Sequence, residues 1–406
     1  MTQRSAFQMK VALEPAAVAG FRFAGVSAGL KTAAGALDLG IIAADRPASA
    51  AAVFSANRVK AAPVYVTADR VKSGRLQAIV ANSGCANSFT GKEGMRLARD
   101  SCALVAQLLG CAPELVVPSS TGVIGHLYDF EKFKNGAADA VRSLRDDGLA
   151  DFAHAIMTTD TRPKTASTTF KAGGVTITLA GAVKGVGMIS PKMATMLGYL
   201  VTDAMIAPTL LKRSLKAALP TSFNAITVDG DMSTNDTVII MASGAAENRA
   251  FGARDQAVFD GAVEEVSAAL ARELVRDGEG ATKLVTVEVR GARSPADAER
   301  AARQIANSPL VKTAFFGCDP NVGRILMAAG SSGAYVESDK LVLWIGGVKV
   351  AAQGRLLTEA LPEAGTAMKA REFEVRLDLR LGKSTATILT CDLSYDYVRI
   401  NAEYTT

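Results

Sequence analysis

The chain of 406 residues is long enough for two domains or one unusually large domain, and its 49% hydrophobic and 21% charged residues are typical of a soluble globular enzyme. The net charge of +5 comes from 45 basic and 40 acidic residues spread along the chain, which argues against a nucleic-acid-binding protein. The segment Met1–Lys10 lacks the apolar core of a signal peptide and no apolar stretch is long enough to cross a membrane, so we expect a cytoplasmic protein.

Strand and helix patterns alternate along the chain, which predicts a mixed α/β (α+β) fold. Hydrophobic periodicity and end signals predict, in chain order, a helix over Gly91–Leu109, a strand over Val175–Ala180, a helix over Ala253–Arg276, a strand over Leu284–Val289, a helix over Pro295–Asn307 and a half-exposed strand over Phe373–Leu381. The longest of these helices is amphipathic, and the residues on its apolar face are Val258, Val263, Val266, Leu270 and Leu274.

The segment Gly181–Met196 is unusual because it is both apolar and rich in residues that break regular structure. Its glycines and Pro191 predict irregular backbone, while its apolar residues predict burial. Buried irregular backbone must find hydrogen-bond partners elsewhere. Such a segment is more often functional than decorative, so we expect it to belong to a site.

Cysteine and histidine are scarce. The odd number of cysteines and the lack of a CxxC pair argue against a disulfide scaffold and fit a reducing cytosol; the five are Cys85, Cys102, Cys111, Cys318 and Cys391. The two histidines, His126 and His154, do not form a zinc site with cysteine at ligand spacing. Either histidine remains possible in a Ser-His-Asp triad, but we expect both to be ordinary surface or core residues.

The sequence also lacks two familiar catalytic motifs, the G-x-S-x-G nucleophile elbow and the GxxxxGK[ST] phosphate loop, and the glycines of 278–283 have the wrong spacing for the latter. A hydroxyl nucleophile without histidine is known where an N-terminal Thr or Ser uses its own α-amine as the base. An α-amine titrates near pH 7.7–8.0, whereas the pKa of a lysine, about 10.4, would have to fall by about 3 units to match it. A threonine inside the chain gains such an amine only when the chain is cut immediately before it.

The residues Lys184–Ile189, Pro191 and Met193–Leu197 resemble the self-cleavage segment of the ornithine acetyltransferases, also called glutamate N-acetyltransferases, some of which are bifunctional with N-acetylglutamate synthase activity. The resemblance covers nearly the whole chain. It includes Gly20–Val26, Ser119–Gly125, Met157–Thr161, Val228–Thr237, Asp277–Lys283, Asp319–Ile325 and Asp396–Thr406. Cys85, where a polar residue is expected, and Val322, where an aromatic one is common, depart from the family pattern.

The resemblance implies the αβ fold of the self-processing DmpA-type aminopeptidases, with mixed β-sheets flanked by helices. Cleavage between Ala194 and Thr195 would give an α chain of residues 1–194 and a β chain of residues 195–406, associated as an α2β2 heterotetramer. The implied reaction is ping-pong: N²-acetylornithine acylates Thr195, ornithine leaves, and glutamate takes the acetyl group, which recycles acetyl groups in arginine biosynthesis. No metal or bound organic cofactor is expected, and acetyl-CoA is a second donor in bifunctional members.

The resemblance also implies roles for individual residues. Thr121 and Gly122 match the oxyanion hole, in which the threonine hydroxyl and the glycine N–H would stabilise the tetrahedral intermediate. The substrate positions, which include the nucleophile itself, match Thr158, Lys184, Thr195, Glu279, Asn401 and Thr406. Glu279 would pair with the side-chain ammonium of ornithine, and the two C-terminal positions imply that the end of the chain folds back into the pocket.

A second hypothesis is an N-terminal-Thr peptidase or amidase on the same scaffold, in which water resolves the acyl-enzyme, and a third is a non-catalytic binding protein.

A cluster of acidic and amide residues could suggest a calcium-binding loop; its members are Asp229, Asp231, Asn235 and Asp236. It lacks the spacing and the closing Glu of an EF-hand, so we interpret these residues as turn and capping residues.

Overall fold

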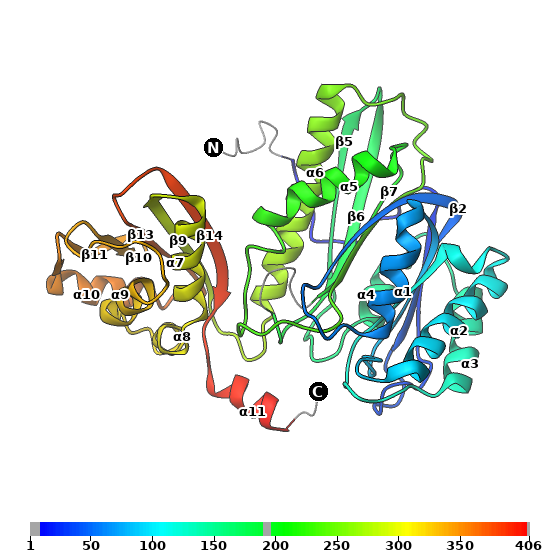
Figure 1. Ribbon diagram of the computed structural model, residues 1–406, viewed down its shortest axis with the longest axis horizontal. Coiled ribbons are helices and arrows are strands. Elements are labelled where there is room, and N and C mark those ends of the chain that lie inside the picture. Colours follow the sequence, from blue (N-terminus) through cyan, green and yellow to red (C-terminus); the bar gives the residue numbers. More distant parts are fainter. Residues whose placement is uncertain (1–8, 190–195, 404–406) are drawn as a thin grey trace.

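A long, bent strand organises the larger of two sheets. β2 (Leu39–Phe54) pairs through its first part with β3 (Arg75–Asn82) and through its last part with β8 (Thr237–Ala242). A register shift between Ala43 and Ala48 separates the two parts, as in a bulge that bends a strand. The structure, a computed structural model, describes residues 9–189 and 196–403 (Figure 1).

The strand order of this sheet is β4-β3-β2-β8-β7-β6-β5, with β1 paired to β2. Neighbouring strands run antiparallel except for two parallel pairs, β3 with β4 and β7 with β8. The remaining strands are β1 (Phe21–Val26), β4 (Val116–Ser120), β5 (Lys164–Ala172), β6 (Val175–Lys184) and β7 (Leu197–Thr202). β7 and β8 therefore lie between β6, which directly precedes β7 in the sequence, and β2, which comes from much earlier.

Helices cover both faces of this sheet, as the alternation of side chains along β2 requires. Ala51 and Val53 belong to the apolar cluster beneath α5 (Pro208–Ala218) and α6 (Ala253–Arg276), whereas Ala50 and Ala52 belong to the cluster beneath α4 (Leu149–Ala155). The first part of β2 packs against α3 (Phe130–Arg142). α2 (Gly91–Leu109) lies beside α3, and α1 (Ala62–Arg70) lies beside α2.

The smaller sheet has the order β12-β11-β10-β13-β9-β14 and lies apart from the larger one, at the left of Figure 1. Only β9 and β13 are parallel. Its strands are β9 (Leu284–Ala292), β10 (Val342–Ile345), β11 (Val348–Ala352), β12 (Arg355–Leu356), β13 (Glu372–Asp378) and β14 (Ser384–Cys391). Its helices are α7 (Pro295–Asn307), α8 (Pro309–Phe316), α9 (Val322–Gly330) and α10 (Leu361–Ala367).

α7 packs directly on β9 and β14 because its inner face is small and apolar. Ser294 caps its N-terminus through the N–H of Asp297, and the helix then places five fully buried residues at helical spacing: Ala298, Ala301, Ala302, Ile305 and Ala306. After β14 the chain returns toward the larger part as α11 (Tyr395–Glu403), seen in red at the bottom of Figure 1.

The structure confirms the three predicted helices with the bounds given above, and the predicted mixed α/β class. Of the predicted apolar face of α6, four residues are fully buried and Val258 is half-buried. The predicted strands over Leu284–Val289 and Phe373–Leu381 correspond to β9 and β13 with shifted ends. No helix in the described residues is long and apolar enough to span a membrane.

One boundary was predicted wrongly, because Gly181 does not break the strand that it was expected to end. β6 continues to Lys184, and a Cβ on Gly181 would lie 2.5 Å from the side chain of Leu200 and 2.8 Å from the carbonyl of Tyr199. This glycine therefore serves close packing within a strand. Irregular backbone begins at Gly185, and Val186 and Ile189 are buried as predicted. The rest of the segment, 190–195, lies outside the described residues.

Candidate active site

The ends of two adjacent strands define one side of a pocket. Lys184 ends β6 and pairs in register with Leu197 at the start of β7, so β6 ends and β7 begins side by side, at the same end of the two strands. On the returning side, the N–H of Met196 donates to Asp236 Oδ1 (3.0 Å) and its carbonyl accepts from the N–H of Thr237 (3.1 Å). Ala194 and Thr195, the predicted cleavage site and nucleophile, lie outside the described residues.

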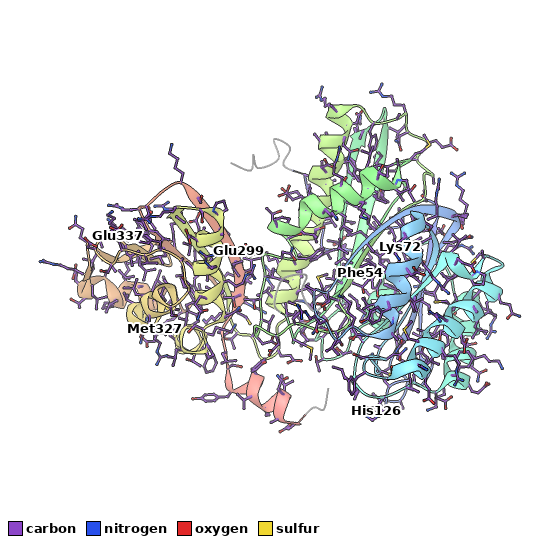
Figure 2. The ribbon with its side chains drawn as sticks, in the orientation of Figure 1. Phe54, Lys72, His126, Glu299, Met327 and Glu337 are labelled. Carbon is purple, nitrogen blue, oxygen red and sulfur yellow. The ribbon has the colours of Figure 1, made fainter. Side chains whose placement is uncertain are left out.

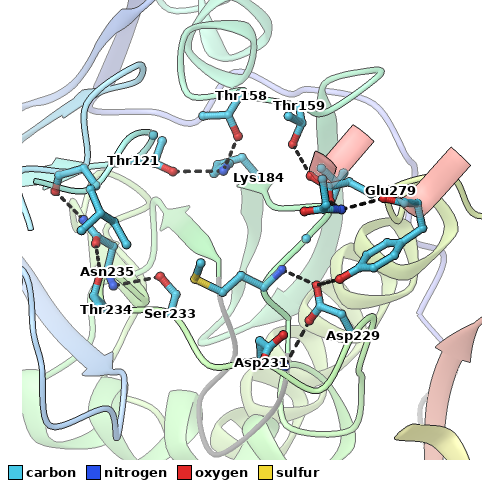
Figure 3. A pocket seen from close by; sticks show the side chains of 18 residues that line it. Thr121, Thr158, Thr159, Lys184, Asp229, Asp231, Ser233, Thr234, Asn235 and Glu279 are labelled. Atoms are coloured by element: carbon cyan, nitrogen blue, oxygen red, sulfur yellow. Dashed lines mark hydrogen bonds between the residues drawn. The ribbon is translucent and has the colours of Figure 1, made fainter. Parts of the chain in front are cut away.

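The same pocket brings together residues that are far apart in the sequence (Figure 3). Six of the predicted site residues line it: Thr121, Gly122, Thr158, Lys184, Glu279 and Asn401. Thr406, the remaining predicted position, is outside the part of the chain that the structure describes. These six residues come from the ends of β4 and β6, the loop after α4, the loop after α6, and the C-terminal helix α11, and the loop before β8 supplies further lining residues.

Lys184 is the central cation of the pocket. Its Nζ donates to the hydroxyl oxygens of Thr121 (3.0 Å) and Thr158 (2.8 Å). Because each hydroxyl accepts a hydrogen bond from the ammonium group, its own proton is available to donate elsewhere. Burial lowers the pKa of Lys184, and the carboxylate of Asp160 opposes this shift.

Gly122 occupies a backbone conformation and a space that only glycine fits. Its φ is +125°, and a Cβ there would lie 2.4 Å from the carbonyl carbon of Gly84 and 2.7 Å from the backbone nitrogen of Cys85. The adjacent Thr121 is fixed through its N–H, which donates to the carbonyl of Asn82 (3.0 Å). The turn after β4 therefore presents a rigid threonine hydroxyl and a closely packed glycine backbone to the pocket.

Glu279 lies at another wall of the pocket and is held by two side chains. Its carboxylate accepts from the hydroxyl of Thr159 and from Nδ2 of Asn401, each at 2.8 Å. Gly187 makes room for it, since a Cβ on Gly187 would lie 2.5 Å from Glu279 Oε2. A carboxylate fixed in this way can receive the ammonium group of a ligand.

The C-terminal helix reaches the pocket although none of its residues is buried. Its anchors are Asn401 on Glu279, the hydroxyl of Tyr397 near Asp229 (3.4 Å), and Ser394, which donates to the carbonyl of Gly280 (2.6 Å). The expectation that the end of the chain folds back into the pocket thus agrees with the position of Asn401.

Sequence reasoning missed the part that Asp229 plays. Its carboxylate accepts from the N–H groups of Met188 (2.5 Å) and Ile189 (2.9 Å), and so supports the irregular segment that follows β6. It also accepts from the N–H of Asp231 (3.1 Å), the turn role that was expected. Burial raises the pKa of Asp229 to about 6. Its position in one of the family-like stretches was the only signal for this second role.

Both histidines are exposed and neither lines the pocket, which agrees with the expectation of ordinary residues. Figure 2 shows His126 at the lower edge of the larger part. The described residues contain no group of three or more His, Cys, Asp or Glu side chains that could hold a metal ion. Of the two departures from the family pattern, Cys85 is buried with its thiol 3.0 Å from the carbonyl of His126, and Val322 begins α9 in the smaller part.

A family model and the curated relatives point to one family. The sequence model of the ArgJ family matches residues 22–406. An arginine biosynthesis bifunctional protein ArgJ from Geobacter sulfurreducens is 52% identical over 393 residues, which cover 96% of this chain and 100% of that protein.

Solved structures of relatives match as well. An ArgJ from Bacillus halodurans is 43% identical, with a TM-score of 0.48 over 50% of this chain and 96% of its own. An ornithine acetyltransferase from Mycobacterium tuberculosis, solved with ornithine, is 34% identical, with a TM-score of 0.41 over 45% of this chain and 98% of its own. On the strength of the nearly full-length sequence matches, this chain belongs to the ArgJ family.

Proposed function

We propose that the chain is an acyltransferase of arginine biosynthesis, which moves an acetyl group from N²-acetyl-L-ornithine to L-glutamate through an acetyl ester on Thr195. Membership of the ArgJ family supports the reaction. The observation that carries the proposal is the polarity of the pocket, which holds the Lys184 ammonium bound to two threonine hydroxyls and, on another wall, the Glu279 carboxylate. A substrate with a carboxylate and a side-chain ammonium complements both groups.

The proposed nucleophile becomes active by cleavage. The hydroxyl of Thr195 attacks the carbonyl of Ala194, and the acyl group shifts from nitrogen to oxygen, which breaks the peptide bond and frees the α-amine of Thr195. Water then hydrolyses the ester, which releases the Ala194 carboxylate and restores the Thr195 hydroxyl. That amine then removes the hydroxyl proton in each turnover. Asp236 and Thr237 hold both polar backbone groups of Met196, the next residue in the chain, and this supports a fixed position for the new chain start.

The sheet order supports the expectation that the two chains, residues 1–194 and 195–406, stay associated. β7 and β8 come from the second chain, yet they lie between β2 and β6 of the first. Separation would break the β2–β8 and β6–β7 ladders and expose β7 and β8, in which every residue is buried. The α2β2 assembly and the cytoplasmic location remain proposals that rest on the resemblance.

Within the pocket we assign the oxyanion hole to the Thr121 hydroxyl and the Gly122 N–H. The Lys184 ammonium leaves the Thr121 proton available for this purpose, because Lys184 donates to the same oxygen. Thr158, Glu279, Asn401 and Thr406 are the remaining proposed substrate positions. The chemistry uses groups of the chain alone, with acetyl-CoA as a second donor if the enzyme is bifunctional.

The decisive experiment is an acetyl-transfer assay on purified protein with acetylornithine and, separately, acetyl-CoA as donors and glutamate as acceptor. Intact-mass analysis of the same preparation should show two chains that break between Ala194 and Thr195, and Thr195→Ala should give one inactive chain. Ornithine release that is independent of glutamate would favour the amidase alternative, and full activity of an uncut chain would refute the proposed activation.

A further inference from the structure

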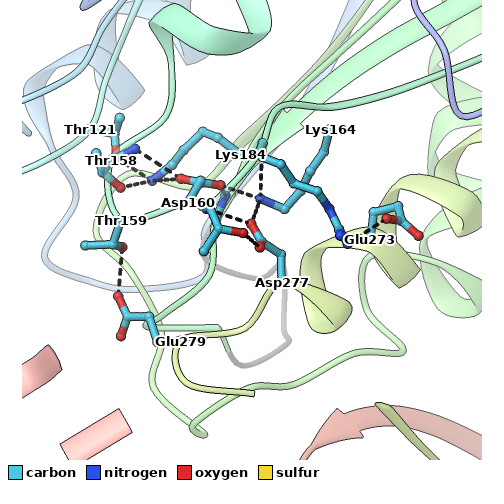
Figure 4. A network of polar contacts seen from close by, with 12 residues as sticks. Thr121, Thr158, Thr159, Asp160, Lys164, Lys184, Glu273, Asp277 and Glu279 are labelled. Carbon is cyan, nitrogen blue, oxygen red and sulfur yellow. Dashed lines mark hydrogen bonds and ion pairs between the residues drawn. The ribbon is translucent and has the colours of Figure 1, made fainter. Parts of the chain in front are cut away.

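Behind the pocket lies a chain of four charges that alternate in sign (Figure 4). It runs from the Lys184 ammonium through the Asp160 carboxylate and the Lys164 ammonium to the carboxylate of Asp277, directly after α6. The side chains of Asp160 and Lys164 are completely shielded from solvent, and those of Asp277 and Lys184 are 4% and 8% exposed. Because an unpaired buried charge is very unfavourable, the four groups depend on one another.

Asp160 is the link between this chain and the pocket. Its Oδ1 accepts from Lys164 Nζ (2.7 Å) and from the N–H of Gly185 (2.9 Å), and its Oδ2 accepts from the N–H of Thr158 (3.0 Å). One carboxylate thus fixes the backbone at Thr158 and the backbone directly after Lys184. The side chains of Thr158 and Lys184 meet in the pocket through a 2.8 Å hydrogen bond.

The distance from Asp160 to the Lys184 ammonium has a chemical consequence. Oδ2 lies 4.0 Å from Lys184 Nζ, close enough for strong attraction but too far for a hydrogen bond. Two of the three ammonium protons go to Thr121 and Thr158. Asp160 therefore supplies the counter-charge without taking the third proton, which a substrate carboxylate can accept.

We propose that Asp160 is a positioning residue of the active site, which keeps the Lys184 ammonium charged and aimed between Thr121 and Thr158, and that Lys164 and Asp277 hold Asp160 in place. This inference rests on the proposed acetyl transfer. Lys164 is held on its far side by Asp277 Oδ2 (2.5 Å), which also accepts from the N–H of Thr161 (3.1 Å).

Other charged groups also act on Lys184, and together they determine whether a substitution should raise or lower its pKa. The carboxylates of Asp160, Glu279 and Asp236 favour its charged form, whereas burial and the like charge of Lys164 disfavour it. Lys31, half-buried in the loop before β2, is close enough for mutual repulsion with Lys184. Loss of Asp160 and loss of Lys164 should therefore shift the titration of Lys184 in opposite directions.

The experiment compares three variants in the mature enzyme: Asp160→Asn, Lys164→Met, and the matched control Asp277→Asn, which alters the same network without contacting Lys184 or Thr158. The pH dependence of kcat/KM for acetylornithine is measured for each. At high pH, activity should fall as the Lys184 ammonium loses its proton, and the midpoint of this fall is the alkaline limit of activity. An opposite charge within 4–6 Å shifts a pKa by about 1–3 units, so Asp160→Asn should lower the alkaline limit by about one pH unit or more. Lys164→Met should raise that limit, and Asp277→Asn should move it least.

A purely structural network gives a different result. In that case Asp160→Asn and Asp277→Asn lower the melting temperature alike, and the alkaline limit does not move in either, which overturns the inference. A shift of the same sign in Asp160→Asn and Lys164→Met overturns it as well. If Asp160→Asn fails to fold, Lys164→Met decides alone, and an unchanged or lowered limit counts against us.

A second measurement separates this inference from the proposed function. Trace propionic anhydride labels neutral lysines in competition with one another, and the labelled peptide that contains Lys184 is quantified by mass spectrometry across pH. The midpoint of labelling should fall in Asp160→Asn and rise in Lys164→Met. If the wild-type enzyme transfers no acetyl group, the proposed function fails, while the labelling midpoints still decide the role of Asp160.

Discussion

Replacement of Glu279 by glutamine should remove one negative charge from the pocket and leave its shape intact. In the structure Glu279 accepts one hydrogen bond from the Thr159 hydroxyl and one from Asn401 Nδ2. A glutamine can remake both, because its oxygen can accept from Asn401 while its NH₂ donates to the Thr159 oxygen, which can act as donor or acceptor. Glu279→Gln therefore tests the charge by itself.

The size of the effect follows from the ligand that Glu279 is proposed to bind. A hydrogen bond to a charged group contributes about 1.5–3 kcal/mol, which corresponds to about 10- to 150-fold in kcat/KM. Acetylornithine carries a side-chain ammonium and should lose this interaction. Glutamate carries no such group, so its kcat/KM should stay within about fivefold of the wild-type value, since weak rim electrostatics contribute about 0–1 kcal/mol.

Ping-pong kinetics give kcat/KM for the two substrates independently, so one enzyme preparation provides both numbers. Glu264→Gln is a matched control, because Glu264 also accepts from a threonine hydroxyl, that of Thr221 (2.8 Å), but lies outside the pocket. The reasoning is refuted if Glu279→Gln impairs both substrates equally, or if acetylornithine is used as well as before.

Three further outcomes are expected. Gly122→Ala should lower acetyl transfer by more than about 100-fold, the usual loss of an oxyanion-hole donor, because its Cβ would lie 2.4 Å from the carbonyl carbon of Gly84; an active variant in steady-state assay contradicts this. Gly187→Ala places a methyl group 2.5 Å from a Glu279 oxygen, so kcat/KM should fall more for acetylornithine than for glutamate; equal losses argue against it. The pKa of Asp229 is raised from 3.8 to about 6, so the folded state keeps a proton that the unfolded state loses, and stability falls by about 2 kcal/mol between pH 4 and pH 6; Asp229→Asn should flatten this part of the melting profile, and an unchanged slope would exclude Asp229 as its source.

Local signals in the sequence were sufficient for α2, α6 and α7, although α3, which is as long as α7, was not predicted. α2 ends at Gly110, which has the left-handed conformation that favours glycine at this position, and α7 begins with a serine cap followed by proline. They were insufficient at Gly181, where a glycine serves close packing inside a strand. Sequence alone does not reveal whether a glycine turns the chain or accommodates a neighbour, because the neighbour comes from another strand.

The pocket shows the same division between local and long-range information. The family-like stretches identified residues such as Lys184 and Glu279, which the structure brings into one pocket. They did not reveal how the Lys184 ammonium is balanced in a buried site, because its counter-charge, Asp160, is itself held by contacts between distant segments. Asp160 pairs with Lys164, four residues later in the sequence, and Lys164 pairs in turn with Asp277, more than a hundred residues later. Only the fold places the carboxylates of Asp160 and Asp277 on either side of the Lys164 ammonium.

The sheet also explains how a chain break and an intact fold can coexist. The strands on either side of the proposed cleavage segment, β6 and β7, are already joined by a full ladder from Leu179–Thr202 to Lys184–Leu197. A break between Ala194 and Thr195 therefore removes a covalent link between two strands that the sheet holds together independently. Asp229 supports the segment after β6 and Asp236 supports Met196 before β7, so each side of the break keeps its own anchor. The new chain start can thus gain a free amine while the pocket residues on β4, β6 and α11 stay where the uncut fold has placed them.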